Sequence, residues 1–277
     1  KEIGEEYYRL IELDDVEPPH EEFYSNPKKI KGINLEFSAT NLSKYEQCPL
    51  SFKYNFIDKM MISGYKPSAS VGIFVHKVLE IIYESRNSNP QYIKNVLKDV
   101  WDDSFFENDT QSKEYFYESE KLLMEYFKFH SIDSDVMYMV EKDLKIKIKS
   151  NIFRGKIDRI DIHNDGKIDI IDYKTSGKKK TEGKSRKDMQ LLYYSYLLSK
   201  IKMKSIKSKI PDSSSFEFIR FPENSRVQVS FTKDDISKAE ARIEKIMKDL
   251  KENKFQPKIN SMCFFCDYKR LLCPLYK

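Results

Sequence analysis

The sequence predicts a globular α/β protein in which helices flank a central mixed sheet. Hydrophobic residues make up 40% of the 277 residues and aromatic residues 13%, which is enough to bury one sizeable core. The apolar pattern is helical from about residue 38 to 129, alternates from 144 to 175, and then gives helix, strands and helix. This order excludes a disordered chain and favours a layered α/β fold.

The beginning of the chain is set apart by its charge. Residues 1–22 carry nine acids and two bases, a net of −7, so the remainder carries +12 within the total of +5. Prolines follow at 18, 19 and 27, and we expect residues 1–36 to be an acidic linker or docking arm and 37–277 to be the folded domain. The basic body suits a polyanion such as nucleic acid, although a Lys-rich solvated surface explains the charge equally well.

The first half of the folded body has a helical pattern. Ser38 can cap a helix that contains Leu42 and Tyr45, Pro49 interrupts this helix, and residues 50–57 resume it. The aromatic residues of the later helices are expected to pack in the core rather than to stack on bases. These helices are predicted over residues 69–85, 90–106 and 113–129.

An alternating pattern then predicts a three-stranded antiparallel meander. Its strands are expected over residues 144–148, 152–162 and 167–175. The sequence His163-Asn164-Asp165-Gly166 supplies the turn between the last two strands. The remaining predicted elements are a basic loop, a helix over residues 187–201, strands over 216–221 and 227–231, and a last helix capped by Thr232.

Acidic residues interrupt the apolar pattern of the meander. Asp172 and Lys174 are two apart on one strand, so their side chains leave the same face, and Asp158 on the neighbouring strand can share it. Two carboxylates and an ammonium group are costly to desolvate unless a cation and a substrate lie between them. Metal-assisted phosphodiester hydrolysis needs these groups, whereas the alternative is a ladder of surface ion pairs across a hairpin.

The pattern of Asp158 and Asp172-Tyr173-Lys174 resembles that of the PD-(D/E)XK nuclease superfamily, specifically its RecB-type branch. Ile157 stands where the proline of that name would be, at a position that varies in this branch. The resemblance extends over most of the chain, from about residue 37 to 274. It implies a restriction-endonuclease-like core with a helical N-terminal region and a C-terminal cysteine segment.

Further positions follow the order of motifs in this branch. His76, at the end of Gly72-Ile73-Phe74-Val75-His76, resembles its metal-ligating histidine, and Glu141 resembles a position that is frequently acidic. Gln190 and Tyr194 resemble its Gln-x-x-x-Tyr motif, which helps to hold DNA and the active site. Taken alone, the histidine and the Gln/Tyr pair are more typical of ordinary helix packing. In this order they favour the family.

The resemblance implies a role for each residue of the site. Lys174 would orient the attacking water or help to deprotonate it, and Gln190 and Tyr194 would support the substrate strand. A divalent cation, Mg²⁺ or Mn²⁺, would offset charge on the leaving oxygen. The implied ligands of this cation are His76, Asp158, Asp172 and the carbonyl oxygen of Tyr173.

The four cysteines can form one site although Cys48 lies far before the other three. Cys263-x2-Cys266-x6-Cys273 places three thiols in a short C-terminal segment. Four thiolates suit either a tetrahedral Zn²⁺ or an iron–sulfur cluster, and buried free thiols are the third possibility. The arrangement resembles RecB-type nucleases of the AddB kind and related CRISPR-adaptation nucleases, which implies a [4Fe–4S] cluster that ties the two ends of the domain together.

The loop between Lys174 and the helix at Gln190 is strongly basic. Its residues 176–187 hold six basic residues against one acid and are bounded by glycine and serine. Composition fits a solvated mobile loop as well as a DNA contact, but the position beside the proposed metal site favours phosphate contacts. The candidates for DNA binding are Lys178, Lys179, Lys180, Lys184 and Arg186.

We therefore interpret the sequence as that of a Mg²⁺- or Mn²⁺-dependent deoxyribonuclease, an exonuclease in preference to an endonuclease, that acts on single-stranded or unwound DNA ends. Family analogy adds a helicase domain or subunit as partner, a role in DNA repair or recombination, and a cytoplasmic, nucleoid-associated location. The alternatives are a non-catalytic nucleic-acid-binding module of the same fold and a zinc-stabilised structural domain. No apolar run approaches the roughly 20 residues of a membrane-spanning helix and no signal-peptide pattern is present, so no membrane contact is expected.

Overall fold

The computed structural model describes residues 36–60, 67–201 and 209–276, so nearly all of the predicted acidic arm lies outside the described residues. The chain divides into two compact units, which are described separately below. The larger unit contains Asn34–Ser43 and Gly64–Met247, and the smaller unit contains Lys44–Ser63 and Lys248–Lys277. None of the helices in the described ranges is both long and apolar enough to cross a membrane.

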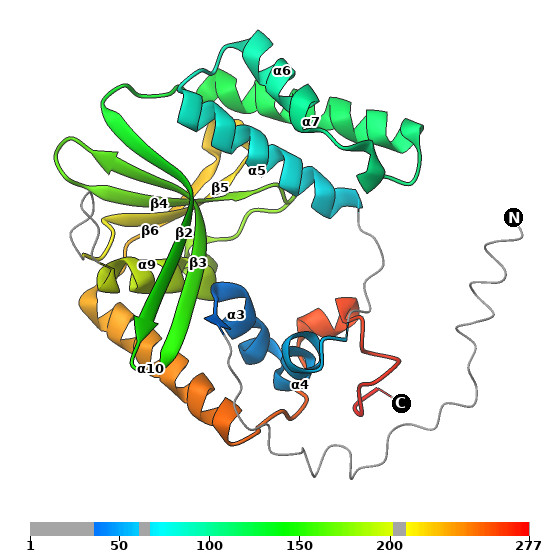
Figure 1. The fold of residues 1–277 in the computed structure, drawn as a ribbon, viewed down its shortest axis with the longest axis vertical. Coiled ribbons are helices and arrows are strands. Elements are labelled where there is room, and N and C mark those ends of the chain that lie inside the picture. Colours follow the sequence, from blue (N-terminus) through cyan, green and yellow to red (C-terminus); the bar gives the residue numbers. More distant parts are fainter. Residues whose placement is uncertain (1–35, 61–66, 202–208, 277) are drawn as a thin grey trace, which may run out of the picture. The chain divides into compact units, whose positions relative to one another are not determined.

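A six-stranded mixed sheet forms the centre of the larger unit (Figure 1). The long strand β3 pairs antiparallel with β2 on one edge, and its other edge is shared by β4, which is antiparallel, and β1, which is parallel. Strand β5 is parallel to β4, and β6 is antiparallel to β5. The strands are β1 (Glu36–Phe37), β2 (Val136–Ile148), β3 (Asn151–His163), β4 (Ile168–Lys174), β5 (Ser213–Phe218) and β6 (Arg226–Val229). The predicted meander and the predicted mixed sheet are confirmed.

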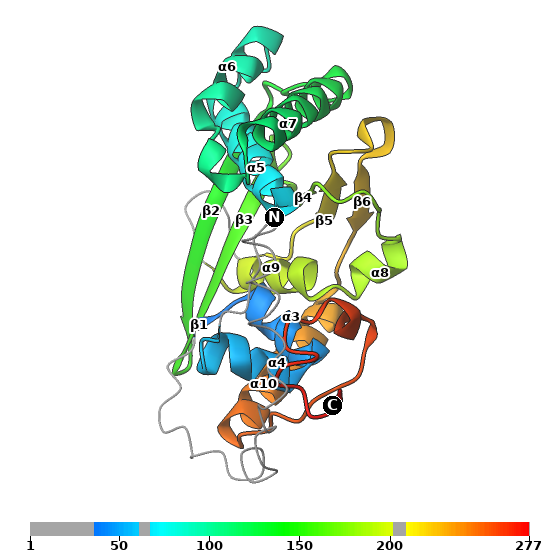
Figure 2. The same ribbon diagram turned by 90° about the vertical axis from the view of Figure 1, so that its right-hand side faces the viewer.

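Helices lie on both sides of this sheet, with α5, α6 and α7 grouped on one side and α9 on the other (Figures 1 and 2). The main helices are α3 (Ala39–Gln47), α5 (Pro67–Ser85), α6 (Pro90–Val100), α7 (Asp109–Phe129), α8 (Glu182–Arg186), α9 (Met189–Lys200) and α10 (Lys233–Lys251). Most predicted helices are therefore confirmed within a few residues. The short helix α8 falls in the segment that was predicted to be a basic loop.

Two predicted boundaries differ from the structure for local reasons. The helix predicted over 90–106 ends at Val100, because Trp101 is extended and Asp102 caps a separate 3₁₀ turn, Asp103–Phe105. Strand β2 begins at Val136, eight residues before the predicted start at 144. Its first half pairs with β3 and packs against α5, and half-buried residues there lack the strict alternation of the second half.

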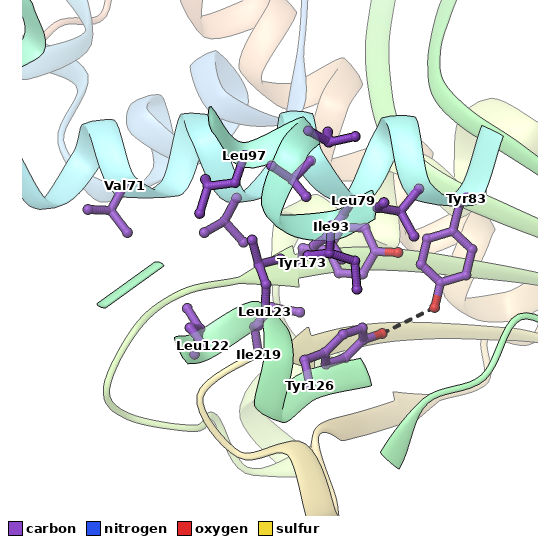
Figure 3. Packing of buried hydrophobic residues seen from close by; sticks show 14 of the residues in the cluster. Val71, Leu79, Tyr83, Ile93, Leu97, Leu122, Leu123, Tyr126, Tyr173 and Ile219 are labelled. Atoms are coloured by element: carbon purple, nitrogen blue, oxygen red, sulfur yellow. Dashed lines mark hydrogen bonds between the residues drawn. The ribbon is translucent and has the colours of Figure 1, made fainter. Parts of the chain in front are cut away.

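The core of the larger unit lies between α5, α6, α7 and the sheet (Figure 3). Helix α5 places Val78, Leu79 and Ile82 there without exposure to solvent. Strand β4 contributes the side chains of Ile171 and Tyr173 to this cluster. The predicted core role of the aromatic residues is also confirmed, because rings such as Trp101 and Phe106 stack on Phe74 of α5.

Helix α9 packs closely against β3, and a glycine makes this approach possible. A Cβ atom at Gly155 would lie 2.7 Å from Cδ1 of Leu197 and 3.3 Å from the ring of Tyr194. Tyr193 fixes the same contact, because its hydroxyl donates to the carbonyl oxygens of Phe37 at 2.7 Å and Arg154 at 3.0 Å. This packing holds the first turns of α9 beside the end of β4.

The smaller unit combines a segment after α3 with the C-terminal segment of the chain. The short helix α4 (Pro49–Phe52) continues into a π-helical turn, Lys53–Ile57, and a 3₁₀ turn, Ser261–Phe265, lies near the C-terminus. Its core is small and centres on Leu50, Tyr54 and Tyr268. The hydroxyl of Tyr54 donates to the carbonyl of Leu272 at 3.1 Å, which ties the two segments together.

Candidate active site

The predicted catalytic residues come together where β3 and β4 separate. The ladder between these strands ends at the pair Arg159 and Ile171, and the same register would place Asp158 opposite Asp172. At this point the backbone amide of Tyr173 donates to Oδ2 of Asp158 at 2.8 Å. A carboxylate side chain therefore takes the place of a backbone acceptor, and it is held at the fork between the two strands.

Asp172, Lys174 and Gln190 form a hydrogen-bonded cluster beside this fork. Asp172 is only 1% exposed, and its Oδ2 contacts the ammonium group of Lys174. Gln190 reaches in from the first turn of α9, where its Nε2 donates to Oδ1 of Asp172 at 2.5 Å and its Oε1 accepts from Lys174 at 3.0 Å. The same Nε2 lies 3.3 Å from the hydroxyl of Tyr194, and Asp188 caps the helix by accepting from the amide of Gln190. The cluster fixes the carboxylate and the ammonium relative to each other.

Burial changes the protonation of this cluster. It raises the pKa of Asp172 to about 7, and the neighbouring Asp158 adds to the rise while the Lys174 ammonium opposes it. Burial is also the main reason that the pKa of Tyr194 lies above its ordinary value. Oδ2 of Asp172 is buried and has no hydrogen-bond partner among the described residues, apart from its ionic contact with Lys174. A buried oxygen in this state fits a ligand for a cation.

A histidine and two carboxylates form a second group around Asp158. One ligand atom each of His76, Glu141 and Asp158 lies within 4.8 Å of the others, and Nδ1 of His76 is 3.4 Å from Oδ2 of Asp158. Burial lowers the pKa of His76, but the hydrogen bond and charge of Asp158 and the charge of Asp172 outweigh this effect, so the pKa is raised. Helix α5 supplies the histidine, β2 the glutamate and β3 the aspartate.

The donor atoms of this region suit a small divalent cation. Carboxylate oxygens are typical ligands of Mg²⁺ and Mn²⁺, and the group contains no soft thiolate. The structure differs from the predicted ligand set in one respect. The compact group contains Glu141, whereas Asp172 lies outside it and is held by Lys174 and Gln190. The backbone of Tyr173 lies at the site through its amide, and a role for its carbonyl oxygen stays a prediction.

A buried cation behind the site was not among the predicted functional residues. Arg159 donates to both carboxylate oxygens of Asp161 and, at 2.7 Å, to the hydroxyl of Tyr173. Its guanidinium also lies 4.1 Å from the ring centroid of Tyr83 on α5. These contacts join β3, β4 and α5 next to Asp158. The sequence signal for the contacts of Arg159 was the run of charged residues in Asp158-Arg159-Ile160-Asp161, within a predicted strand.

The predicted DNA-binding residues do not form a uniformly free basic loop. Lys179 donates to Oδ1 of Asn224 at 3.2 Å, and Lys180 pairs with Asp188 at 2.5 Å while its Nζ lies 4.4 Å from the ring centroid of Phe216. Arg186 in α8 lies 3.7 Å from a carboxylate oxygen of Asp235. The other two predicted residues, Lys178 and Lys184, are exposed.

The four cysteines all line one cavity of the smaller unit. Cys48, Cys263, Cys266 and Cys273 are free and half-buried. Burial is the main cause of the raised pKa of the Cys273 thiol. Among the described residues no three of these sulfur atoms lie within 4.8 Å of one another. Four thiols that line one cavity are a donor set for a thiolate-bound metal group, either a zinc ion or an iron–sulfur cluster.

Comparison with known proteins matches residues 36–274 to the model of the PD-(D/E)XK nuclease superfamily. A search of curated proteins finds no match. Among solved structures, a Eubacterium rectale protein provisionally described as an exonuclease is similar at 12% identity and a TM-score of 0.52, over 86% of this chain and 89% of the other. The protein SSO0001 is similar at 18% identity and a TM-score of 0.47, over 93% and 92% of the two chains. The similarity to the Eubacterium rectale structure agrees with the fold described above.

Proposed function

Because the chain belongs to the PD-(D/E)XK nuclease superfamily, we propose that it is a metal-dependent deoxyribonuclease that hydrolyses phosphodiester bonds at single-stranded or unwound DNA ends. One observation carries the proposal. Asp158, Asp172 and Lys174 lie together at the fork of β3 and β4, with Gln190 bonded to both members of the Asp172–Lys174 pair. A member of the fold without catalytic function would have no need of a buried carboxylate whose pKa is raised to about 7.

The residues of the chain position the reactants. Lys174 is an ammonium donor held at a fixed place by Asp172 and Gln190, so it can bind a phosphate oxygen or orient the attacking water. Asp158 is locked by the amide of Tyr173 and keeps its carboxylate directed at the fork. Tyr194 supports Gln190 from the next turn of α9.

A divalent cation held by His76, Asp158 and Asp172 would act as a Lewis acid and neutralise charge on the phosphate. The raised pKa of Asp172 is consistent with this role, because a nearby dication favours the charged carboxylate and would release its proton. Mg²⁺ and Mn²⁺ both fit the oxygen and nitrogen ligands.

For the cysteine cavity we propose a [4Fe–4S] cluster bound by Cys48, Cys263, Cys266 and Cys273. Four thiols on one cavity support it, and the order of the cysteines, one early and three in a C-terminal segment, differs from the two local pairs that zinc modules usually have. The wider biological role is also a proposal: exonuclease action, cooperation with a helicase domain or subunit, and a place in DNA repair or recombination in the cytoplasm at the nucleoid.

The proposed activity is tested with anaerobically purified protein and end-labelled single- and double-stranded DNA, in Mn²⁺, Mg²⁺ or EDTA. Asp172→Ala and Lys174→Ala should each lower the cleavage rate by at least about a thousandfold, because each removes a group that acts on the reacting phosphate. Circular dichroism should show that both variants keep their fold. Wild-type cleavage rates in both variants, or equal cleavage in EDTA, would contradict the assignment.

A further inference from the structure

Glu141 has an unusual backbone conformation at a break in the pairing between β2 and β3. Strands β2 and β3 pair from Val136–His163 to Val140–Arg159 and again from Lys142–Ile157 onward, and the break between these stretches falls at Glu141 and Asp158. Glu141 has a φ of 48°, a left-handed conformation that a residue with a side chain rarely adopts. This conformation accompanies a carboxylate that is only 13% exposed and lies in the group with His76 and Asp158.

The partner of this carboxylate is a lysine that reaches in from solvent. The ammonium group of Lys156, two residues before Asp158 on β3, contacts Oε2 of Glu141, while the Lys156 side chain as a whole is 64% exposed. The hydrogen bond to Glu141 is the main reason that the pKa of Lys156 is raised. The charged end of a largely exposed lysine is therefore placed against one of the half-buried carboxylates of the candidate metal group.

The ammonium group of Lys156 and a divalent cation cannot both interact fully with the carboxylate of Glu141. A cation that binds Oε2 must displace Nζ of Lys156, and one that binds Oε1 lies a few ångströms from a positive charge and is repelled. The charges agree with such a competition. The site carries three carboxylates, on Glu141, Asp158 and Asp172, and two ammonium groups, on Lys156 and Lys174. Removing the charge of Lys156 leaves a more negative site.

We propose that Glu141 is a further ligand of the divalent cation and that Lys156 competes with the cation for its carboxylate, so that this ion pair sets the metal affinity of the site. The inference rests on the proposed metal-dependent nuclease function and deepens it. It assigns no chemical step to Lys156, whose part is to weaken metal binding. As a consequence, the site needs a higher concentration of the cation for half-saturation than its ligands alone would require.

The test is a titration of the full chain with Mn²⁺ after treatment with a chelator, in which electron paramagnetic resonance measures the free ion. Lys156→Gln should lower the Kd for Mn²⁺ by at least about fivefold, which is the effect of one unit charge on another at about 4 Å in a water-like medium, because the ion carries two charges. Lys145→Gln is the matched control, because Lys145 is an exposed lysine that forms an ion pair with Glu36 at 2.5 Å and lies four residues beyond Glu141, roughly 13 Å along β2. It should change the Kd by less than twofold.

Glu141→Gln gives the second arm of the test. It should raise the Kd for Mn²⁺ by at least about tenfold, and in the double variant with Lys156→Gln the fivefold gain should disappear, since without its partner carboxylate the exposed Lys156 is no longer held beside the metal group. An unchanged or raised Kd in Lys156→Gln would overturn the inference, and so would a gain that persists in the double variant. A wild-type protein that binds no Mn²⁺ would instead contradict the proposed function, so the two failures are distinguishable.

Discussion

The carboxylate site of the larger unit and the cysteine cavity of the smaller unit differ in how far the protein itself satisfies their polar groups. In the first, Asp172, Lys174 and Gln190 bond to one another, and the backbone holds Asp158. In the second, four free thiols line a cavity, and Cys48 and Cys266 pack against a cluster of three buried residues. The comparison teaches that the groups of the first site satisfy one another, whereas the thiols of the second remain available to a bound group.

The surroundings of the two sites agree with this difference. The site of the larger unit lies between well-packed helices and the sheet, next to the buried contacts of Arg159. In the smaller unit, Phe264 and Phe265 in the turn that contains Cys263 are 78% and 68% exposed. A segment that buries so few of its apolar side chains gains little stability from packing. A bound group at the cavity is therefore expected to contribute much of the stability of the smaller unit.

The largest expected effect is on the smaller unit, through Cys48→Ser. This cysteine is the only one of the four on the N-terminal segment of the unit, and closing a loop of more than two hundred residues stabilises a fold by about 5 kcal/mol if a cluster acts as a cross-link. The variant should lose its iron and its visible absorbance, melt at a lower temperature and become sensitive to protease near Tyr54 and Tyr268. Iron analysis, thermal melting and limited proteolysis measure these changes.

The control for this prediction is the larger unit. Binding of Mn²⁺ at the carboxylate site should change by less than about threefold in Cys48→Ser, since none of the ligands of that site belongs to the smaller unit. A variant that keeps its iron, colour and melting temperature would show that Cys48 is not a ligand. The expectation that a bound group stabilises the smaller unit would then be wrong.

A smaller effect is expected from the protonation of Asp172 in the larger unit. Burial raises its pKa to about 7, so between about pH 4 and 7 the folded protein keeps a proton that the unfolded chain has lost. The free energy of unfolding in EDTA should therefore fall as the pH rises through this range and level off above pH 7. Chemical denaturation at a series of pH values measures this slope.

Asp172→Asn sharpens the result, because an amide keeps the size of the side chain and cannot titrate. Its unfolding free energy should lose the part of the pH slope that Asp172 supplies, while Asp188→Asn, which alters the cap of α9, should keep it. An equal slope in wild type and Asp172→Asn would show that the buried carboxylate stays ionised. The favourable charge interaction with Lys174 would then outweigh the free-energy cost of burying the ionised carboxylate.

The sequence predicted the two sites to different extents, for physical reasons. Asp172 and Lys174 could be placed on one face because the period of a strand fixes it, whereas Gln190 and Tyr194 were assigned by the family resemblance, because a Gln/Tyr pair one helical turn apart is by itself ordinary. The role of Glu141 in the group with His76 could not be predicted, since it depends on a left-handed residue at a break in a long hairpin. The same holds for Lys156.

The basic loop also shows that contacts between segments are hard to predict from the sequence. The position of the loop beside the proposed metal site favoured Lys178, Lys179 and Lys180 as DNA contacts, but two of these lysines have partners outside the lysine run. Asn224 accepts from Lys179, and Asp188 pairs with Lys180. Patterns within one segment therefore predicted the elements and the face of the catalytic strand, whereas contacts between segments decided which charges remain available.

The smallest expected effect is on the salt dependence of DNA binding. It shows whether the basic loop of the larger unit contributes to DNA affinity. The logarithm of the binding constant falls with the logarithm of salt by roughly 0.7 to 0.9 per phosphate contact. Three independent lysine contacts would flatten this slope by about two to three in a variant with Lys178, Lys179 and Lys180 changed to Gln. Because Lys179 and Lys180 already have protein partners, we expect a change of about one, and Lys178→Gln alone should give most of it.

Fluorescence anisotropy with a labelled single strand and EDTA measures the slope without cleavage. Lys128→Gln is the control, since this lysine on α7 is 61% exposed and pairs with Glu125. A loss of two or more in the triple variant would mean that DNA draws Lys179 and Lys180 away from their partners. An unchanged slope would remove the loop from the interface and direct the search to the smaller unit, where the basic residues Lys269 and Arg270 follow the exposed rings of Phe264 and Phe265.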